Sequence, residues 1–279
     1  MYKKLISLLL ATIIIMSSFS VLAIDKYGGY PIQVDISVNE SFIKCVHKPI
    51  MVENHTYIPL RAFSDAIGAT VSWDAKESAA TITKGNHSFV FYSGRDYCYI
   101  DGKQTNHKAI EYKDLLFVPV RAMTTALGYE VQWDSTYLTV KITADNINVP
   151  ENCRDYSYTY EDMLYLARIT QIESGSQSFA AKLGVANTVM NRVRSNLFPN
   201  SVKGVVLDTK YGTQFPPAHT DSFYITPSKT NMLAAKCALN GINNVGNSLY
   251  FASKTNAQSS WAHRNRTYYT TIGWILFYL

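Results

Sequence analysis

Carboxylate side chains are scarce in the C-terminal part of the chain, and one of them stands at a position suited to acid–base chemistry. The carboxylates that follow residue 162 are Glu173, Asp208 and Asp221. Glu173 precedes a Ser-Gly-Ser-Gln turn at the end of an expected helix. A carboxyl group partly withdrawn from water keeps its proton to higher pH and then acts as a general acid. Glu173 is therefore the first candidate for a proton donor, with an ion pair to Arg168 or Lys182 as the structural alternative.

Two expected helices position the residues around Glu173. The pattern Thr159-x-x-Asp162 is a capping box and predicts a helix over Tyr160–Ser174, ended by Gly175. Apolar residues at spacings of three and four predict a second helix that ends before Pro199. This apolar stripe consists of Leu183, Ala186, Met190, Val193 and Leu197. Asn191 and Arg192 lie beside the stripe rather than within it.

The ends of the chain carry two apolar segments. Residues 1–23 read as a secretory signal, because Lys3-Lys4 precede an apolar stretch and Val21-Leu22-Ala23 offers a cleavage site. An uncleaved N-terminal anchor is the alternative. The run Ile272 to Leu279 is too short to span a membrane and predicts a buried strand. We therefore expect a secreted, cell wall-associated protein, the spore cortex being one such wall.

Composition and charge indicate a globular protein with two unlike halves. The chain has 279 residues, of which 47% are apolar and 17% charged, enough for two domains. From Arg154 onward there are 12 Lys and Arg against 6 Asp and Glu, whereas Asp25–Cys153 has 12 against 15. The basic C-terminal half suits an anionic partner. For an exported protein, anionic cell-wall polymers fit this role better than nucleic acid.

Four cysteines offer three disulfide pairings, which the sequence does not decide. They are Cys45, Cys98, Cys153 and Cys237. There is no Cys-x-x-Cys pattern and no neighbouring His pair, so no metal site is expected. Buried thiols or a single Cys45–Cys98 bridge are the favoured alternatives.

The N-terminal half contains an internal repeat, because residues 49–74 and 109–134 follow one pattern at an offset of 60. The matched pairs are Pro59/Pro119, Arg61/Arg121, Ala62/Ala122, Gly68/Gly128, Val71/Val131, Trp73/Trp133 and Asp74/Asp134. Each copy predicts a strand, a helix that starts at Pro-x-Arg, a Gly turn, and a strand ending in Trp-Asp. This is a duplicated supersecondary unit. We expect the repeated Arg and Trp side chains to pack the fold and fix its turns rather than bind a ligand.

These features resemble the copper amine oxidase N-terminal-like domain over most of residues 45–145. The resemblance implies a stalk or wall-associating module rather than an oxidase, since the six His residues form no His-x-His pair. On this reading residues 25–148 form the repeat domain and 149–160 a linker. Residues 161–279 then form the catalytic domain.

The C-terminal half resembles the SleB/CwlJ-type cell wall hydrolases, known from spore cortex-lytic enzymes, over about residues 163–273. The motifs are Ala167-Arg168, Ile172-Glu173-Ser174-Gly175, Val185 to Val193 with Asn191-Arg192, Phe198-Pro199, Gln214-Phe215, Ser248 to Phe251, Ser260-Trp261 and Thr271-Ile272-Gly273. The resemblance implies a lysozyme-like domain that cleaves peptidoglycan strands at the MurNAc–GlcNAc bond as a lytic transglycosylase. It also implies that Glu173 is the catalytic glutamate and that no metal or organic cofactor is needed.

The residue-level chemistry agrees with a single catalytic acid. Most glycosidases use two carboxylates. A lytic transglycosylase needs one, because the muramyl C6 hydroxyl attacks its own anomeric carbon. The alternatives are a muramidase-type hydrolase that uses Asp208 or Asp221, and a wall-binding protein whose catalytic domain has decayed.

Polar and aromatic residues of the same motifs are candidates for substrate binding, since flat rings stack on sugar faces. The candidates are Gln177, Asn191, Arg192, Gln214, Tyr250, Phe251, Trp261, Tyr268 and Tyr269. The alternative roles are structural: Asn191 can bond backbone at a helix crossing, and Tyr250 or Trp261 can belong to the core.

The sequence departs from the pattern of this family at three places. Gln177 stands where a second acid is usual, Ser253-Lys254 replace Asn-Pro, and Ile275 replaces a His. The last change motivates the alternative of a wall-binding protein whose catalytic domain has decayed.

Together these observations predict an α+β protein: a duplicated α/β stalk-type repeat domain, then a mainly helical lysozyme-like domain with a small antiparallel sheet.

Overall fold

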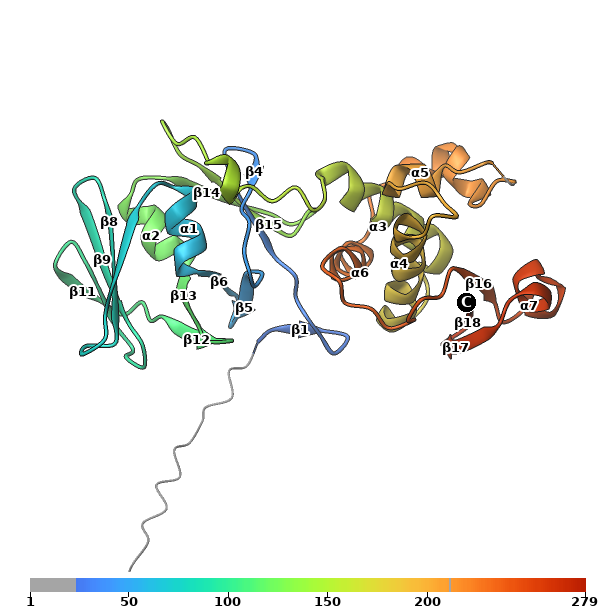
Figure 1. Cartoon of the computed structure of the whole chain (residues 1–279), viewed down its shortest axis with the longest axis horizontal. Coiled ribbons are helices and arrows are strands. Elements are labelled where there is room, and N and C mark those ends of the chain that lie inside the picture. The colour runs from blue at the N-terminus through green and yellow to red at the C-terminus, as the bar shows by residue number, and fades with distance from the viewer. Residues whose placement is uncertain (1–23, 211) are drawn as a thin grey trace, which may run out of the picture.

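The computed structural model describes residues 24–210 and 212–279, which form two lobes lying side by side (Figure 1). The N-terminal lobe is rich in strands with short helices, and the C-terminal lobe is mainly helical with one small sheet. This confirms the predicted α+β class. The predicted secretory signal, residues 1–23, lies outside the described residues.

Three sheets build the N-terminal lobe, beside a hairpin of β1 (Lys26–Tyr27) and β2 (Tyr30–Pro31). The first sheet has the order β11 (Lys103–Thr105), β10 (Cys98–Ile100), β9 (His87–Tyr92), β8 (Ala79–Lys84), β7 (Thr70–Asp74). The second has the order β12 (Ile110–Tyr112), β13 (Leu115–Pro119), β6 (His55–Pro59), β5 (Ile50–Val52). The third has the order β14 (Glu130–Asp134), β15 (Thr139–Thr143), β3 (Asp35–Val38), β4 (Ser41–Phe42), in which β15 and β3 are parallel.

The duplicated unit is confirmed as strand, helix and strand in both copies. The copies are β6–α1 (Leu60–Ala66)–β7 and β13–α2 (Val120–Ala126)–β14, and β6 pairs antiparallel with β13. Gly68 and Gly128 follow the helices with φ of +67° and +70°, a left-handed conformation that favours glycine.

The prediction that the repeated Arg and Trp side chains pack the fold is wrong. Arg61 and Arg121 are exposed, and Trp73 and Trp133 are 54% and 43% exposed. The helix residues that pack into the core of this lobe are Leu60 and Phe63 of α1 and Met123 of α2. Arg61 and Arg121 lie on the exposed faces of α1 and α2, and Trp73 and Trp133 on the exposed faces of β7 and β14.

Helices dominate the C-terminal lobe. They are α3 (Tyr160–Ser174), α4 (Phe179–Arg194), α5 (Val202–Val206), α6 (Lys229–Leu239) and α7 (Trp261–Asn265). The short 3₁₀ turns are η1 (Glu151–Cys153), η2 (Pro216–His219), η3 (Asp221–Tyr224) and η4 (Ala257–Ser259). A three-stranded antiparallel sheet has the order β16 (Tyr250–Ser253), β18 (Ile275–Tyr278), β17 (Tyr268–Ile272). The predicted buried C-terminal strand is thus β18.

The two long helices follow their sequence signals closely. The reciprocal capping box of Thr159 and Asp162 starts α3, which ends at Ser174 before Gly175. Ser178 caps α4 through the amide of Ala181. The second helix differs from the prediction at its end, because α4 stops at Arg194 and Leu197 is 62% exposed. Residues 181–190 are all buried, so α4 is a central helix rather than an amphipathic surface helix.

The segment 149–160, predicted as a linker, packs onto the N-terminal lobe. The amide of Lys44 donates to Cys153 O and that of Asp155 to Phe42 O. Tyr158 is buried, and its hydroxyl donates to Asp35 Oδ1 at 2.7 Å. Leu138 of the N-terminal lobe belongs to the same buried cluster as the core of α3, α4 and α6. The segment is therefore part of an interface between the lobes.

The four cysteines are free thiols, so the Cys45–Cys98 bridge is absent from the structure. Cys98 is buried beside the hydroxyl of Thr105, at 3.0 Å. Within residues 24–210 and 212–279, no helix has the length and apolar character needed to cross a membrane. The same part of the chain contains no group of three or more His, Cys, Asp or Glu that could hold a metal ion.

Candidate functional site

Glu173 lies in the last turn of α3, where the chain turns toward α4. Its carboxyl is half-buried, and burial raises its pKa, with the Arg192 guanidinium opposing part of that rise. Among the described residues, no group donates a hydrogen bond to this carboxyl and no cation forms an ion pair with it. The side chain therefore has the environment of a carboxyl that keeps its proton unusually long.

The structural alternative for Glu173 is wrong, because both candidate cations bind elsewhere. Arg168 donates to the carbonyls of Tyr224 and Ile225 at 3.4 Å. Lys182 donates to Thr230 Oγ1 at 2.9 Å. Glu173 is left without either partner, so its carboxyl is available for other chemistry.

Arg192 on α4 is the cation whose charge opposes the rise in the pKa of Glu173. It is buried, with 5% of its surface exposed. Its Nε donates to Leu249 O at 2.8 Å, and its guanidinium carbon lies 4.9 Å from the Phe198 ring centre and 5.2 Å from that of Phe215. Nη1 is buried without a hydrogen-bond partner in the described residues. Burial lowers the pKa of Arg192 to about 10. The side chain forms a charged centre beneath the site rather than an open binding arm.

The polar candidates Asn191 and Gln177 hold neighbouring loops. Asn191 Nδ2 donates to the carbonyls of Gly246 and Ser248 at 2.7 and 2.9 Å. Gln177 Oε1 accepts from the amide of Trp274 at 3.4 Å, so it connects the turn after α3 to the β17–β18 turn. The backbone-bonding alternative for Asn191 is thus the arrangement observed.

The aromatic candidates divide into buried and exposed groups. Phe251 is half-buried and packs between Phe215 and Phe277, with ring centres 6.3 Å apart in each pair. Tyr250 is half-buried, 5.7 Å from the Arg192 guanidinium carbon and 5.7 Å from the Trp261 ring. Trp261 is 52% exposed, and Tyr268 and Tyr269 are 54% and 47% exposed. Contacts therefore lead from the buried Arg192 through Tyr250 to an exposed tryptophan.

The other two carboxylates of this lobe differ in their surroundings. Asp208 is half-buried, and its charge raises the pKa of Arg192. Its Oδ1 accepts a hydrogen bond from the backbone N–H of Lys210 at 3.0 Å. Gln214 lies in the same loop, where its backbone N–H donates to Asp208 O and its side-chain Nε2 to Gly212 O. Asp221 is exposed at the start of η3. Of the two, Asp208 is the one that the structure brings toward Arg192.

Three residues of the site were not singled out from the sequence. Phe198 and Phe215 face the Arg192 guanidinium, although both stand in motifs that were recognised. Arg266 lies over Tyr250 and Trp261, at 4.7 and 4.5 Å from the ring centres, and donates to the Tyr250 hydroxyl. Arg266 belongs to no sequence pattern that indicates an aromatic contact, so only the tertiary structure identifies it.

Ile275 occupies an apolar position. It is buried in β18 with Ala181, Val185, Val245 and Phe277. An apolar side chain suits this buried cluster. The replacement that motivated a decayed catalytic domain is therefore accommodated by packing.

Comparison with known families identifies both lobes. Residues 37–142 and 104–163 match the copper amine oxidase N-terminal domain, and residues 176–278 match the family described as Cell Wall Hydrolase. The chain therefore carries copper amine oxidase N-terminal domains followed by a SleB-like cell wall hydrolase domain. The matched range of the hydrolase family begins three residues after Glu173.

Several characterised proteins are similar to the C-terminal lobe. A spore cortex-lytic enzyme of Bacillus cereus is 32% identical over 114 residues, which are 41% of each chain. One from Oceanobacillus iheyensis is 27% identical over 116 residues, 42% of this chain and 39% of the relative. The solved catalytic domain of the germination-specific lytic transglycosylase SleB from Bacillus anthracis is 29% identical. That match covers 47% of this chain and all of the solved domain, with a TM-score of 0.40. The similarity thus spans about two fifths of the length of these curated relatives.

Proposed function

We propose that the C-terminal lobe cleaves peptidoglycan glycan strands as a lytic transglycosylase, with Glu173 as its single catalytic acid and base. The observation that carries this proposal is the half-buried, unpaired carboxyl of Glu173, whose pKa burial raises. The similarity of this lobe to spore cortex-lytic enzymes supports cleavage of the cell wall as its activity.

One carboxyl suffices for the complete reaction. Protonated Glu173 gives its proton to the oxygen between MurNAc and GlcNAc while the bond from that oxygen to the muramyl anomeric carbon breaks. The C6 hydroxyl oxygen of the same muramyl ring bonds to the anomeric carbon. The Glu173 carboxylate takes the hydroxyl proton, which restores the acid and leaves a 1,6-anhydro end. No water is consumed.

The surrounding residues have complementary roles in this proposal. Arg192 is buried and does not bind substrate directly. Its positive charge stabilises the carboxylate form of Glu173 that exists midway through the reaction. Trp261, Tyr268 and Tyr269 supply exposed rings on which sugar faces stack. Gln177, Asn191, Gln214 and Phe251 position the loops that carry these groups.

Replacing the proposed acid tests the assignment directly. Glu173→Gln removes the transferable proton and is expected to slow turbidity loss from purified sacculi by at least about 100-fold. Glu161→Gln is the matched control, since Glu161 lies on the same helix but is exposed and paired with Lys203 at 2.8 Å. Equal clearing by wild type and Glu173→Gln would contradict the assignment, and no clearing by either would favour a wall-binding protein.

Product analysis separates the proposed reaction from hydrolysis. Transglycosylation leaves 1,6-anhydro-muramyl ends, whereas a muramidase-type hydrolase leaves reducing ends. Asp208 is the candidate second carboxylate for hydrolysis, because it is half-buried near Arg192. Reducing ends together with inactivation by Asp208→Asn would replace transglycosylation by hydrolysis. Parallel assays on decoated spores and vegetative sacculi identify the wall that is cleaved.

The rest of the chain fits a protein that acts outside the cell. We propose that residues 1–23 are a secretory signal, that 25–148 form a wall-associating repeat domain, and that the catalytic domain follows residue 160. Anionic wall polymers are the partners that the basic C-terminal half suits. N-terminal sequencing of the protein recovered from culture medium or wall fractions tests export and cleavage after residue 23.

A further inference from the structure

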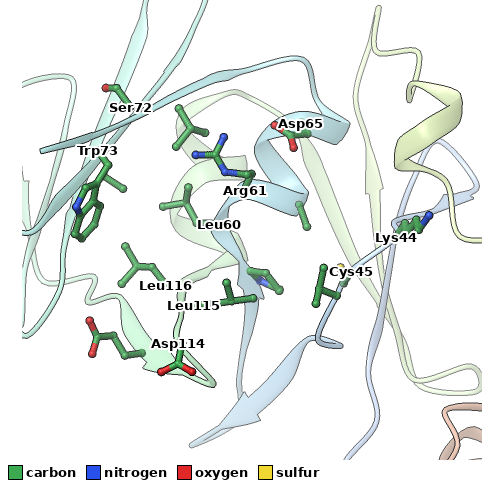
Figure 2. A pocket seen from close by; sticks show the side chains of 16 residues that line it. Lys44, Cys45, Leu60, Arg61, Asp65, Ser72, Trp73, Asp114, Leu115 and Leu116 are labelled. Carbon is green, nitrogen blue, oxygen red and sulfur yellow. The ribbon is translucent and has the colours of Figure 1, made fainter. Parts of the chain in front are cut away.

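A cavity of about 820 Å³ opens in the N-terminal lobe, far in sequence from Glu173. It lies between α1, β7, the hairpin of β12 and β13, and the segment at Lys44–Val46. In Figure 2 the Arg61 side chain extends from α1 toward β7, where Ser72 and Trp73 lie. Lys44 stands at the opposite end of the lining, and Asp114 lies on the hairpin below. The cavity is thus elongated and reaches from one repeat into the other.

Charged side chains of both signs line this cavity and are mostly unpaired. Within residues 24–210 and 212–279, the side chains of Lys44, Arg61, Asp65 and Asp114 form no ion pair or hydrogen bond. Glu111 accepts a hydrogen bond from Ser93. All four side chains are exposed to solvent, so a ligand that enters the cavity can replace their water contacts by charge-assisted hydrogen bonds.

The floor of the cavity is apolar. Leu60, Leu115 and Leu116 contribute to it, and none of the three is exposed. Trp73 stands at its edge with 54% of its surface exposed, a large ring open to contact. A concave apolar surface with a few polar groups at its rim is the usual form of a small-ligand site.

We propose that this cavity binds a short peptide that carries free carboxylates and a free amine, and that its natural occupant is the stem peptide of peptidoglycan. The choice of the stem peptide rests on the proposed function, which brings the protein to the wall. Arg61 and Lys44 bind the carboxylates, Asp65 and Asp114 the amine, and the leucines the methyl side chains. A glycan without peptide is a poorer match. Its MurNAc lactyl group offers one carboxylate to Arg61 or Lys44, but the sugars carry no free amine for Asp65 and Asp114.

The duplication offers an internal comparison within the same lobe. At an offset of 60, the second copy carries Arg121 and Trp133, which do not line the cavity. The partners of Asp65, Glu111 and Asp114 in the other copy are the neutral residues Thr125, Met51 and Asn54. Arg121 and Trp133 are exposed like Arg61 and Trp73, so they are matched controls for general surface effects.

The test uses the full chain and two soluble probes in titration calorimetry. One probe is the stem tripeptide L-Ala-γ-D-Glu-meso-diaminopimelate, and the other is the disaccharide GlcNAc–MurNAc without peptide. We expect the tripeptide to bind wild type and the disaccharide to bind this cavity at least tenfold more weakly. Arg61→Ala and Trp73→Ala are expected to weaken tripeptide binding about tenfold each, whereas Arg121→Ala and Trp133→Ala leave it within about twofold.

Three results would overturn the proposal. They are absence of tripeptide binding to wild type, equal loss in the Arg121 and Trp133 variants, and disaccharide binding that Arg61→Ala or Trp73→Ala weakens to the same degree. Thermal melting curves establish that each variant is folded. Neither probe contains the bond that Glu173 would cleave, so the outcome is separate from the Glu173→Gln assay. Tripeptide binding by a protein that clears no sacculi would refute the proposed catalysis and leave the cavity assignment standing.

Discussion

At the scale of single residues, the candidate site depends on how one buried cation affects one carboxyl. Burial raises the pKa of Glu173 and the charge of Arg192 opposes that rise. A general acid must hold its proton, so activity is expected to fall as the pH rises through the pKa of Glu173. Arg192→Met removes the opposing charge, so the pKa of Glu173 rises further. The alkaline fall in sacculus clearing is therefore expected to move to higher pH.

Arg192→Lys is the control for this shift, because it keeps the charge and a donor for Leu249 O. Its alkaline limb is expected to stay near that of wild type. Urea unfolding of each variant at the assay pH separates lost activity from lost structure. A methionine variant whose pH profile coincides with that of wild type would show that Arg192 does not govern Glu173.

At the scale of elements, α4 is held in place by a close approach to the C-terminal strand. A Cβ added at Gly184 would lie 2.6 Å from Phe277 Cζ and 3.0 Å from Val245 Cγ1. Overpacking of this kind costs about 1–3 kcal/mol, against a gain of about 1 kcal/mol from the higher helix propensity of alanine. Phe277 is fully buried, so it has little room to move. We expect Gly184→Ala to lower the free energy of unfolding by about 1 kcal/mol, measured by urea denaturation.

Phe277→Leu in the Gly184→Ala background tests the cause. The smaller side chain relieves the contact, so the two changes together are expected to cost less than the sum of the single changes. Additive losses would mean that the Gly184–Phe277 approach does not limit packing.

At the scale of the whole molecule, a buried ion pair joins the two lobes. Lys236 of α6 lies 2.8 Å from Asp35 Oδ2 of β3, with side chains 0% and 5% exposed, and also donates to Leu138 O at 2.8 Å. In Figure 1, α6 is the helix of the C-terminal lobe that faces the N-terminal lobe. Lys236→Met would leave the Asp35 carboxylate buried, with Lys48 at 3.5 Å as its remaining ion-pair partner within residues 24–210 and 212–279. We expect the unfolding free energy to fall by about 3 kcal/mol, at the lower end of values for broken buried pairs.

The exposed pair of Lys203 and Glu161 is the comparison for that variant. Its members are 50% and 57% exposed, so Lys203→Met is expected to cost less than about 1 kcal/mol. The double variant Asp35→Asn with Lys236→Met removes both buried charges and is expected to recover part of the loss. Equal small losses in Lys236→Met and Lys203→Met would show that the ion pair does not hold the lobes together.

The sequence by itself determined the features that depend on near neighbours in the chain. The capping box at Thr159 placed the start of α3, Gly175 placed its end, and the offset of 60 placed both copies of the repeat. These signals work because a helix cap or a glycine turn satisfies backbone groups only a few residues away. Glu173 could be proposed as a site residue for the same reason, together with the motifs around it.

Only the tertiary structure decided which side chains are covered, since burial depends on elements far apart in the chain. Arg192 is buried by Phe198, Phe215 and Tyr250, which arrive from three separate segments. Trp73 is 54% exposed at the edge of the cavity, although its place in the repeat predicted a packing residue. The same holds for Asp35 and Lys236, whose pairing across two lobes leaves no local pattern in the sequence.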